Sequence, residues 1–110
     1  MRPMELMPQA ARDALPALGA TEGRANQATV HLKLFDPGGR LTLYVLEYDG
    51  DDLMFGYMKS PLGPGGDEFG YTSLAELRSI RNRLGLPLER DDHWTPVPLA
   101  EALGDPAETT

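Results

Sequence analysis

The chain has 110 residues and a mass of 12.0 kDa, the size of one small domain. Its formal net charge of −7 argues against general binding to nucleic-acid phosphates. The absence of cysteine excludes disulfides, thiol catalysis and cysteine-ligated metals. No apolar stretch approaches the roughly 20 residues that span a membrane, and no signal peptide is visible, so we expect a soluble, cytoplasmic protein.

Residues 1–27 show no strand-like alternation and are predicted to form an N-terminal helix and a connection. The helix is expected to begin near Pro8, because proline suits a first helical turn, and to end or kink at Pro16. A single α+β domain is predicted for residues 28–103. Residues 104–110 are predicted to be a frayed tail.

Alternation of apolar and polar residues predicts strands at 28–35, 40–49 and 53–58, and a shorter one at 68–72. Turn residues between these segments favour an antiparallel meander. The 40–49 strand carries apolar side chains on both faces, with Tyr48 expected beside Tyr44 and Leu46. It is therefore expected to lie centrally, covered on both sides.

The stretch after the last strand begins with a capping box in which Ser73 and Glu76 satisfy each other's backbone amides. The main helix is expected over about 73–84, ending before Gly85. The predicted fold is therefore α+β: a small antiparallel sheet of three to four strands, this helix packed on one face, and short terminal helices. The predicted core consists of Leu32, Leu34, Leu43, Val45, Leu53, Phe55, Leu74, Leu77 and Ile80.

The negative charge is concentrated in residues 47–110, which hold thirteen acidic and five basic side chains. Such a surface attracts a basic partner, repels DNA or keeps the protein soluble. A hairpin tip here is rich in carboxylates, but its spacing lacks the pattern of a calcium loop, so we predict no metal. The segment that follows the Gly-Leu-Pro bend places charge beside the single tryptophan, which favours binding. Candidate binding residues are therefore Glu47, Asp49, Asp51, Asp52, Glu89, Arg90, Asp91 and Trp94.

No catalytic constellation and no cofactor motif are recognisable around the two histidines, His31 and His93. The strand aromatics are expected to be core residues or cross-strand pairs rather than a platform that stacks nucleic-acid bases. An architectural role remains open for the charged segment, with Arg90 holding it against Glu76 and Trp94 closing the edge of the core.

Residues 69–99 resemble a bacterial family of proteins of unknown function, DUF2958, most specifically in the run from Gly85 to Asp91. The similar residues are Tyr71, Ser73, Leu74, Glu76, Leu77, Gly85, Leu86, Pro87, Leu88, Glu89, Arg90, Asp91, Trp94, Pro96, Pro98 and Leu99. Upstream similarity extends the resemblance to about residues 28–103. The resemblance implies a small protein encoded on plasmids or integrating elements, a setting in which proteins for anti-restriction, transfer or regulation are common. It supplies no catalytic residue.

Two functions are compatible with these features. The first is a non-enzymatic interaction module, linked to mobile-element or DNA-handling systems, that binds a protein through its acidic surface and not nucleic acid directly. The alternative is a small ligand-binding domain or enzyme in which Glu47, Glu89, Asp91 and a histidine meet in a cleft between sheet and helix. Neither function involves a membrane, and the oligomeric state is left open.

Overall fold

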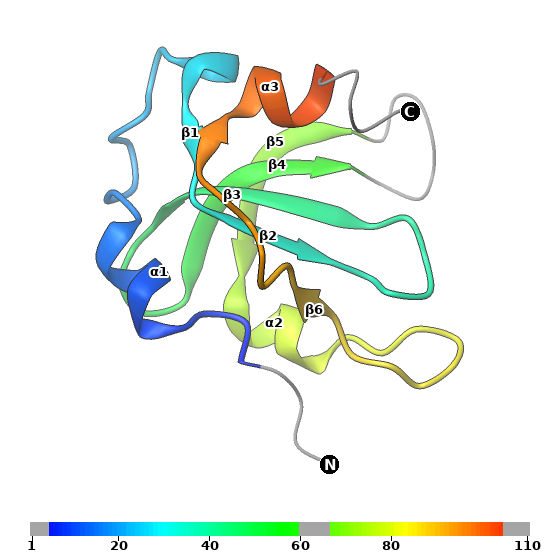
Figure 1. Cartoon of the computed structure of the whole chain (residues 1–110). Helices are drawn as coiled ribbons and strands as arrows, with labels where there is room; N and C mark the ends of the chain where they lie inside the picture. The colour runs from blue at the N-terminus through cyan, green and yellow to red at the C-terminus, as the bar shows by residue number, and fades with distance from the viewer. Residues whose placement is uncertain (1–4, 60–66, 105–110) are drawn as a thin grey trace.

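The computed structural model describes residues 5–59 and 67–104, which adopt a mixed α+β fold (Figure 1). Its strands are β1 (Thr29–Val30), β2 (Leu32–Phe35), β3 (Thr42–Tyr48), β4 (Leu53–Lys59), β5 (Glu68–Ser73), β6 (Glu89–Arg90) and β7 (Val97–Pro98). Its helices are α1 (Gln9–Ala14), α2 (Leu74–Ser79) and α3 (Leu99–Gly104), with a short 3-10 turn, η1, at Ala25–Gln27. The α+β class is thus confirmed.

The main sheet is antiparallel and has five strands in the order β5-β4-β3-β2-β6, while β1 and β7 form a separate pair. The prediction of three to four strands was wrong, because β6 contains only two residues and so leaves no alternation to detect. The predicted strand 28–35 is divided in the structure. Its first part pairs with β7, and its second part pairs with β3 and β6.

The predicted main helix at 73–84 is also wrong, because the described residues contain only short helices and α2 ends at Ser79. The local reason is Asn82, whose side-chain Oδ1 accepts hydrogen bonds from the amides of Leu84 (2.8 Å) and Leu86 (3.0 Å). An asparagine that binds nearby amides in this way competes with helical hydrogen bonding. Leu84, expected on the buried stripe, is 76% exposed.

Apolar side chains pack on both faces of the main sheet. On one face the cluster consists of Leu6, Met7, Ala11, Leu15, Leu32, Leu34, Leu43, Val45, Tyr48, Met54, Leu74, Leu77 and Leu88. On the other face it consists of Ala28, Val30, Tyr44, Leu46, Leu99 and Ala102. Six predicted core residues are buried as expected, whereas Leu53, Phe55 and Ile80 are only partly buried. The expectation that both faces of β3 are covered is confirmed.

A β-bulge in β3 sets which side chains share a face. Val45 pairs with Gly56 and Glu47 pairs with Phe55, so Leu46 is the extra residue on the bulged strand. As a result, Glu47 shares the face of Phe55, and Tyr48 turns to the opposite face and joins the first cluster. The expectation that Tyr48 lies beside Leu46 was therefore wrong.

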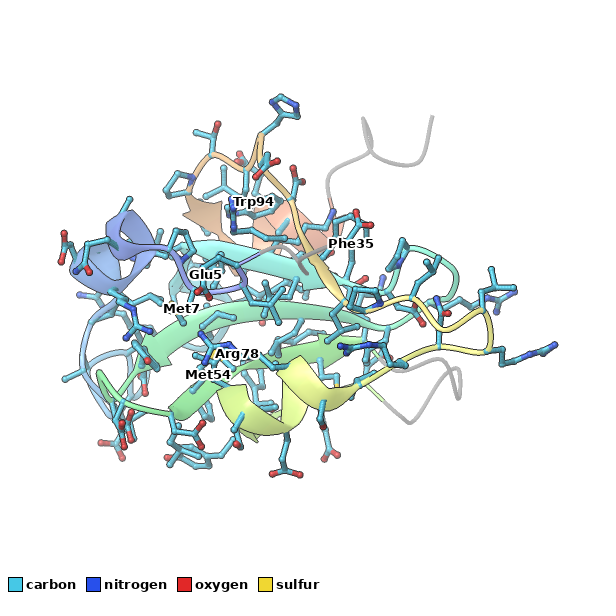
Figure 2. The ribbon with its side chains drawn as sticks, turned by 90° about the horizontal axis from the view of Figure 1, so that it is seen from below. Glu5, Met7, Phe35, Met54, Arg78 and Trp94 are labelled. Atoms are coloured by element: carbon cyan, nitrogen blue, oxygen red, sulfur yellow. The ribbon has the colours of Figure 1, made fainter. Side chains whose placement is uncertain are left out.

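The N-terminal segment packs against the first face through Leu6, Met7, Ala11 and Leu15. Figure 2 shows Glu5 close to Arg78 of α2, and their side chains form an ion pair at 2.9 Å. As expected, α1 begins after Pro8 and ends before Pro16. The proposed boundaries at residues 27 and 103 remain predictions, and the predicted tail lies outside the described residues beyond Gly104.

Candidate functional site

Two carboxylates at the β3–β4 hairpin tip, those of Asp49 and Asp52, accept hydrogen bonds from nearby backbone amides. Asp49 Oδ1 accepts hydrogen bonds from the amides of Asp51 (2.8 Å), Asp52 (2.8 Å) and Leu53 (3.1 Å). The first two of these bonds are the main reason that the pKa of Asp49 is lowered from its ordinary value. Asp49 is thus the residue that shapes the turn.

Asp52 joins the hairpin tip to the start of α2. Its Oδ2 accepts a hydrogen bond from the Ser73 hydroxyl (2.7 Å), and its Oδ1 accepts one from the amide of Ala75 (2.8 Å). These two bonds lower the pKa of Asp52. Ser73 in turn accepts the amide of Glu76 at 3.2 Å, as a helix N-cap does. Asp51, by contrast, is exposed.

Glu47 is the one buried carboxylate among the described residues, with only 2% of its surface exposed. Oε1 accepts the amide of Gly19 (2.7 Å), and Oε2 accepts both the amide (2.8 Å) and the hydroxyl of Thr21. Burial by itself would raise the pKa of Glu47, but the hydrogen bonds from Thr21 and Gly19 outweigh it and the pKa is lowered. Glu47 therefore anchors the connection between α1 and η1 as an anion.

The segment after the Gly-Leu-Pro bend lines an open depression of about 470 Å³ on the other side of the sheet from α2. Glu89 lies opposite Phe35 in β6, and the amide of Asp91 donates to the carbonyl of Lys33 at 3.0 Å. All three candidate residues of this run, Glu89, Arg90 and Asp91, line the depression together with His93.

Arg90 does hold the C-terminal segment in place, but the hydrogen bonds that define its position go to Glu5 and Asp92. Its Nε donates to the carbonyl of Glu5 at 3.0 Å, and its guanidinium forms an ion pair with Asp92 at 2.6 Å. These contacts place the N-terminal segment beside β6.

Trp94 closes the edge of the second cluster, as the architectural hypothesis stated. Its indole Nε1 donates to the carbonyl of Val30 at 2.9 Å, and its ring lies 6.0 Å from that of Tyr44 (Figure 2 labels Trp94). Lys33 Nζ lies 5.5 Å from the centre of the Trp94 ring and 5.9 Å from that of Tyr44. This is the geometry of a cation–π contact.

The structure does not gather the candidate residues into one site. Asp49 and Asp52 lie at one end of the β3–β4 hairpin, whereas Glu89 lies beside Phe35, whose partner in β3 is Thr42 at the opposite end of that strand. Thr42 and Tyr48 are six positions apart along β3, a distance of roughly 20 Å. Glu47 does not line the depression that holds Glu89 and Asp91.

The two histidines are also separated. His93 lines the depression near β6, while His31 lies between β1 and β2. His31 Nδ1 is buried without a hydrogen-bond partner among the described residues, and burial lowers the pKa of its imidazole. His31 is thus favoured in its neutral form.

The aromatic side chains of β4 and β5 were expected to be core residues or cross-strand pairs, and the cross-strand pairs are confirmed. Phe55 packs against Phe69 and Tyr71, with ring centres 6.0 and 5.0 Å apart, and Tyr57 packs edge-on against Phe69 at 5.0 Å. Sequence reasoning missed their exposure, since Tyr71 is 62% and Phe69 37% exposed. This exposure could have been predicted, because 68–72 is the last strand of the meander and therefore lies at an edge of the sheet.

Within residues 5–59 and 67–104, no three histidine or acidic side chains lie close enough together to hold a metal ion. No helix in these ranges is both long and apolar enough to cross a bilayer.

The fold and these contacts define a small α+β protein whose two-faced antiparallel sheet is covered on one side by the N-terminal segment and α2. On the other side it is partly covered by α3. A family model described as "Protein of unknown function (DUF2958)" matches residues 6–103, most of the chain. The chain belongs to this family. No curated protein and no solved structure matches it.

Proposed function

We propose that this chain is a protein-interaction domain that binds an extended, basic segment of another protein along strand β5. The observation that carries the proposal is the exposed aromatic row on an edge strand. Among the described residues, no strand pairs with the outer side of β5, and this edge strand is six residues long. An edge of this kind offers unpaired backbone groups that an added strand can use.

The aromatic side chains give such a segment something to pack against. Phe69 and Tyr71 are two residues apart on β5, so both project from the same face of the sheet. Every second side chain of an added strand would project from that face too and could pack against them. Phe69 also lines an open depression of about 370 Å³, together with Phe55, Leu46 and residues 21–25 of the segment between α1 and β1. Exposed aromatic residues next to a depression are the usual anchors of protein interfaces.

Charge supports a basic occupant. Glu68 lies at the start of β5 and is exposed. At its end, Ser73 is hydrogen-bonded to Asp52, and the exposed Asp49 and Asp51 lie on the same hairpin tip. A segment that carries lysine or arginine near both ends would meet carboxylates at both ends of β5. Such basic segments are common in proteins that handle nucleic acids, consistent with the mobile-element setting that the family resemblance implies.

The same charges disfavour a second copy of this chain as the occupant. Two antiparallel β5 strands paired around their centre would place Glu68 of each copy beside Ser73 of the other. Each junction would then bring together Glu68 and Asp52, and like charges in close contact oppose pairing. Edge-to-edge dimerisation through β5 is thus the less favourable arrangement.

The test is a selection of random peptides displayed on phage, bound to the wild-type domain after depletion on the variant Tyr71→Thr. Threonine keeps a strand-forming residue at this exposed position and removes only the ring. We expect the recovered peptides to alternate apolar and basic residues, and to bind Tyr71→Thr about tenfold more weakly than wild type. Leu84→Thr, which removes an exposed apolar side chain elsewhere, should leave their binding unchanged.

A direct readout completes the test. Amide hydrogen exchange in residues 68–73 should slow when a recovered peptide is bound, because an added strand protects the outer backbone groups of β5. Recovery of no peptide that depends on Tyr71, recovery of acidic peptides, or protection confined to other strands would contradict the proposal.

A second candidate function, small-ligand binding, is favoured by one observation: Lys33, Glu89, Asp91 and His93 line the same depression of about 470 Å³. Neighbouring groups of opposite charge suit a small charged metabolite. A thermal-shift panel of amino acids and nucleotides tests it, with Glu89→Gln as the comparison. A ligand that stabilises the wild type and not Glu89→Gln supports binding there, and a flat panel argues against it.

A further inference from the structure

A hydrogen-bonded loop between α2 and β6 carries basic and apolar side chains in a protein whose net charge is negative. Residues 81–86 form this arginine-leucine loop, which extends beside the β2–β3 turn at the right of Figure 1. Its shape depends on Asn82. Besides the two amides that its Oδ1 accepts, its backbone amide donates to the carbonyl of Leu86 (2.9 Å), and its carbonyl accepts the amide of Gly85 (2.9 Å). Gly85 has a φ of +80°, a conformation that glycine adopts without strain.

The loop is also fixed to the body of the protein. Asn82 Nδ2 donates to Asp36 Oδ1 at 2.8 Å, and the same oxygen accepts the amide of Gly38 at 3.0 Å. Gly38 lies so close to Asn82 that a Cβ at this position would come within 2.7 Å of the asparagine amide nitrogen. Two loops far apart in sequence are therefore held together as one unit.

Between these loops lies an open depression of about 600 Å³ that arginines line. Arg81 and Arg83 contribute from one side, and Gly38 and Gly39 from the other, with Arg40 following in the same turn. Arg81 is held in place by hydrogen bonds to the carbonyls of Arg78 (2.9 Å) and Ile80 (2.8 Å). The one carboxylate among the lining residues, Asp36, is already bonded to Asn82 and Gly38. The depression is thus basic in a protein whose net charge is −7.

An apolar contact accompanies this charge. Leu84 lines the same depression and is 76% exposed, and Leu86, two residues on, is 42% exposed. A single exposed leucine is ordinary on a protein surface. Because the hydrogen bonds of Asn82 already fix the backbone that carries both leucines, the loop loses little backbone entropy when a partner covers them.

We infer that the arginine-leucine loop and the depression beside it bind an acidic, apolar segment of a protein, with carboxylates at Arg81 and Arg83 and an apolar side chain on Leu84. The charge favours this occupant over a nucleic acid. A polyphosphate chain that extended beyond the depression toward β6 would meet the carboxylates of Glu89, Asp91 and Asp92, which line the neighbouring depression, whereas a short peptide with few carboxylates would not. This site does not depend on the function proposed for β5.

The probe is a fluorescent peptide of alternating aspartate and leucine, titrated by anisotropy against the wild-type domain at low and at physiological salt. We expect Arg83→Glu to weaken binding about tenfold or more, and Leu84→Thr to weaken it about fivefold. Arg24→Glu changes the net charge equally at an exposed position elsewhere, and binding to it should stay within about twofold of wild type. Tyr71→Thr should likewise have no effect.

Three results would overturn the inference. One is the absence of peptide binding by the wild-type domain, and another is an equal loss in Arg24→Glu and Arg83→Glu, which would show a response to net charge alone. The third is tighter binding of a single-stranded oligonucleotide with the same dependence on Arg83. Circular dichroism and thermal unfolding of each variant establish that the loop substitutions leave the fold intact, as their exposed side chains lead us to expect.

Discussion

Glu47 and Thr21 lie 26 residues apart in sequence and are joined by two hydrogen bonds, both accepted by one carboxylate oxygen of Glu47. The other oxygen accepts the amide of Gly19. A residue that the sequence offered as a binding carboxylate thus uses both of its oxygens inside the protein. Its position follows from the bulge in β3, which places Glu47 opposite Phe55 and under the connection between α1 and η1.

The substitution Glu47→Gln should lower the free energy of unfolding by about 1–3 kcal/mol. Glutamine keeps one acceptor but turns an NH₂ group toward an amide that needs an acceptor, so one buried donor loses its partner. Urea denaturation measures the change. Asp51→Asn, which removes an exposed charge three residues past the end of the same strand, should stay within about 0.5 kcal/mol of wild type. Equal stability of Glu47→Gln and wild type would show that the buried carboxylate contributes nothing.

Acid should remove the contribution of Glu47. Because its pKa is lower in the folded protein than its ordinary value of 4.5, its stabilising effect is fully present above that value. The effect is lost as the pH falls through the lower, folded pKa. Asp49 and Asp52 have lowered pKa values too, so wild type alone cannot isolate Glu47. We expect the stability difference between wild type and Glu47→Gln to stay constant from pH 7 down to the ordinary value of 4.5, and to shrink as the pH falls below it. Urea denaturation at several pH values measures this difference. A difference that stayed constant down to acid pH would contradict the stabilising role of the Glu47 carboxylate.

Gly56 and Gly70 are direct cross-strand partners in β4 and β5, and they should respond differently to alanine. A Cβ at Gly56 would run into the carbonyl oxygen of Tyr44, whereas a Cβ at Gly70 would meet nothing within 4 Å. Gly56→Ala should therefore cost about 1–3 kcal/mol of stability, and Gly70→Ala should be neutral or slightly stabilising. Thermal unfolding of both variants decides the matter, and equal effects would exclude the close approach as the cause.

Removal of the Asp52 side chain should weaken the start of α2. Asp52→Ala loses the bonds to Ser73 and Ala75, and we expect it to lower the midpoint of thermal unfolding, as the loss of other helix caps does. Asp51→Ala on the same tip is the control and should have little effect. A charge reversal meant to test partner binding at this tip is therefore informative at Asp51 and misleading at Asp52. If both alanine variants were equally stable, the capping role would be refuted.

The strands were the predictable part of the fold. The β-rich runs 40–49 and 53–58 are bounded by turn residues, so β3 and β4 appear where expected, although the bulge in β3 moves Tyr48 to the other face. The helix prediction failed at its C-terminal half, because Leu77, Ile80 and Leu84 have helical spacing but Asn82 offers the backbone closer partners. Periodicity reports which residues could share a face and not which hydrogen bonds compete locally.

The candidate site was only partly predictable. Glu89, Arg90 and Asp91 do line one depression, because neighbours in sequence stay neighbours in space. The bulge that buries Glu47 could not be predicted, because the residues around Leu46 are ordinary strand residues and nothing in them marks where the register shifts. The turn-forming role of Asp49 follows a familiar habit of aspartate and could have been anticipated with more weight on it, whereas the bonds of Asp52 to Ser73 and Ala75 span more than 20 residues and could not.

The pairing of β1 with β7 fixes the order in which this protein can be completed during synthesis. Val30 is fully buried beneath residues near the other end of the domain, and the carbonyl of Ala28 accepts the amide of Leu99 at 2.8 Å. A ribosome that has released the chain only as far as β6 exposes a sheet whose first face can be covered and whose second face is still bare. Closure must wait for Leu99 and Ala102 to emerge. Until then, Tyr44 and Leu46 of the nascent chain stay exposed and can bind a chaperone or associate with another unfinished chain.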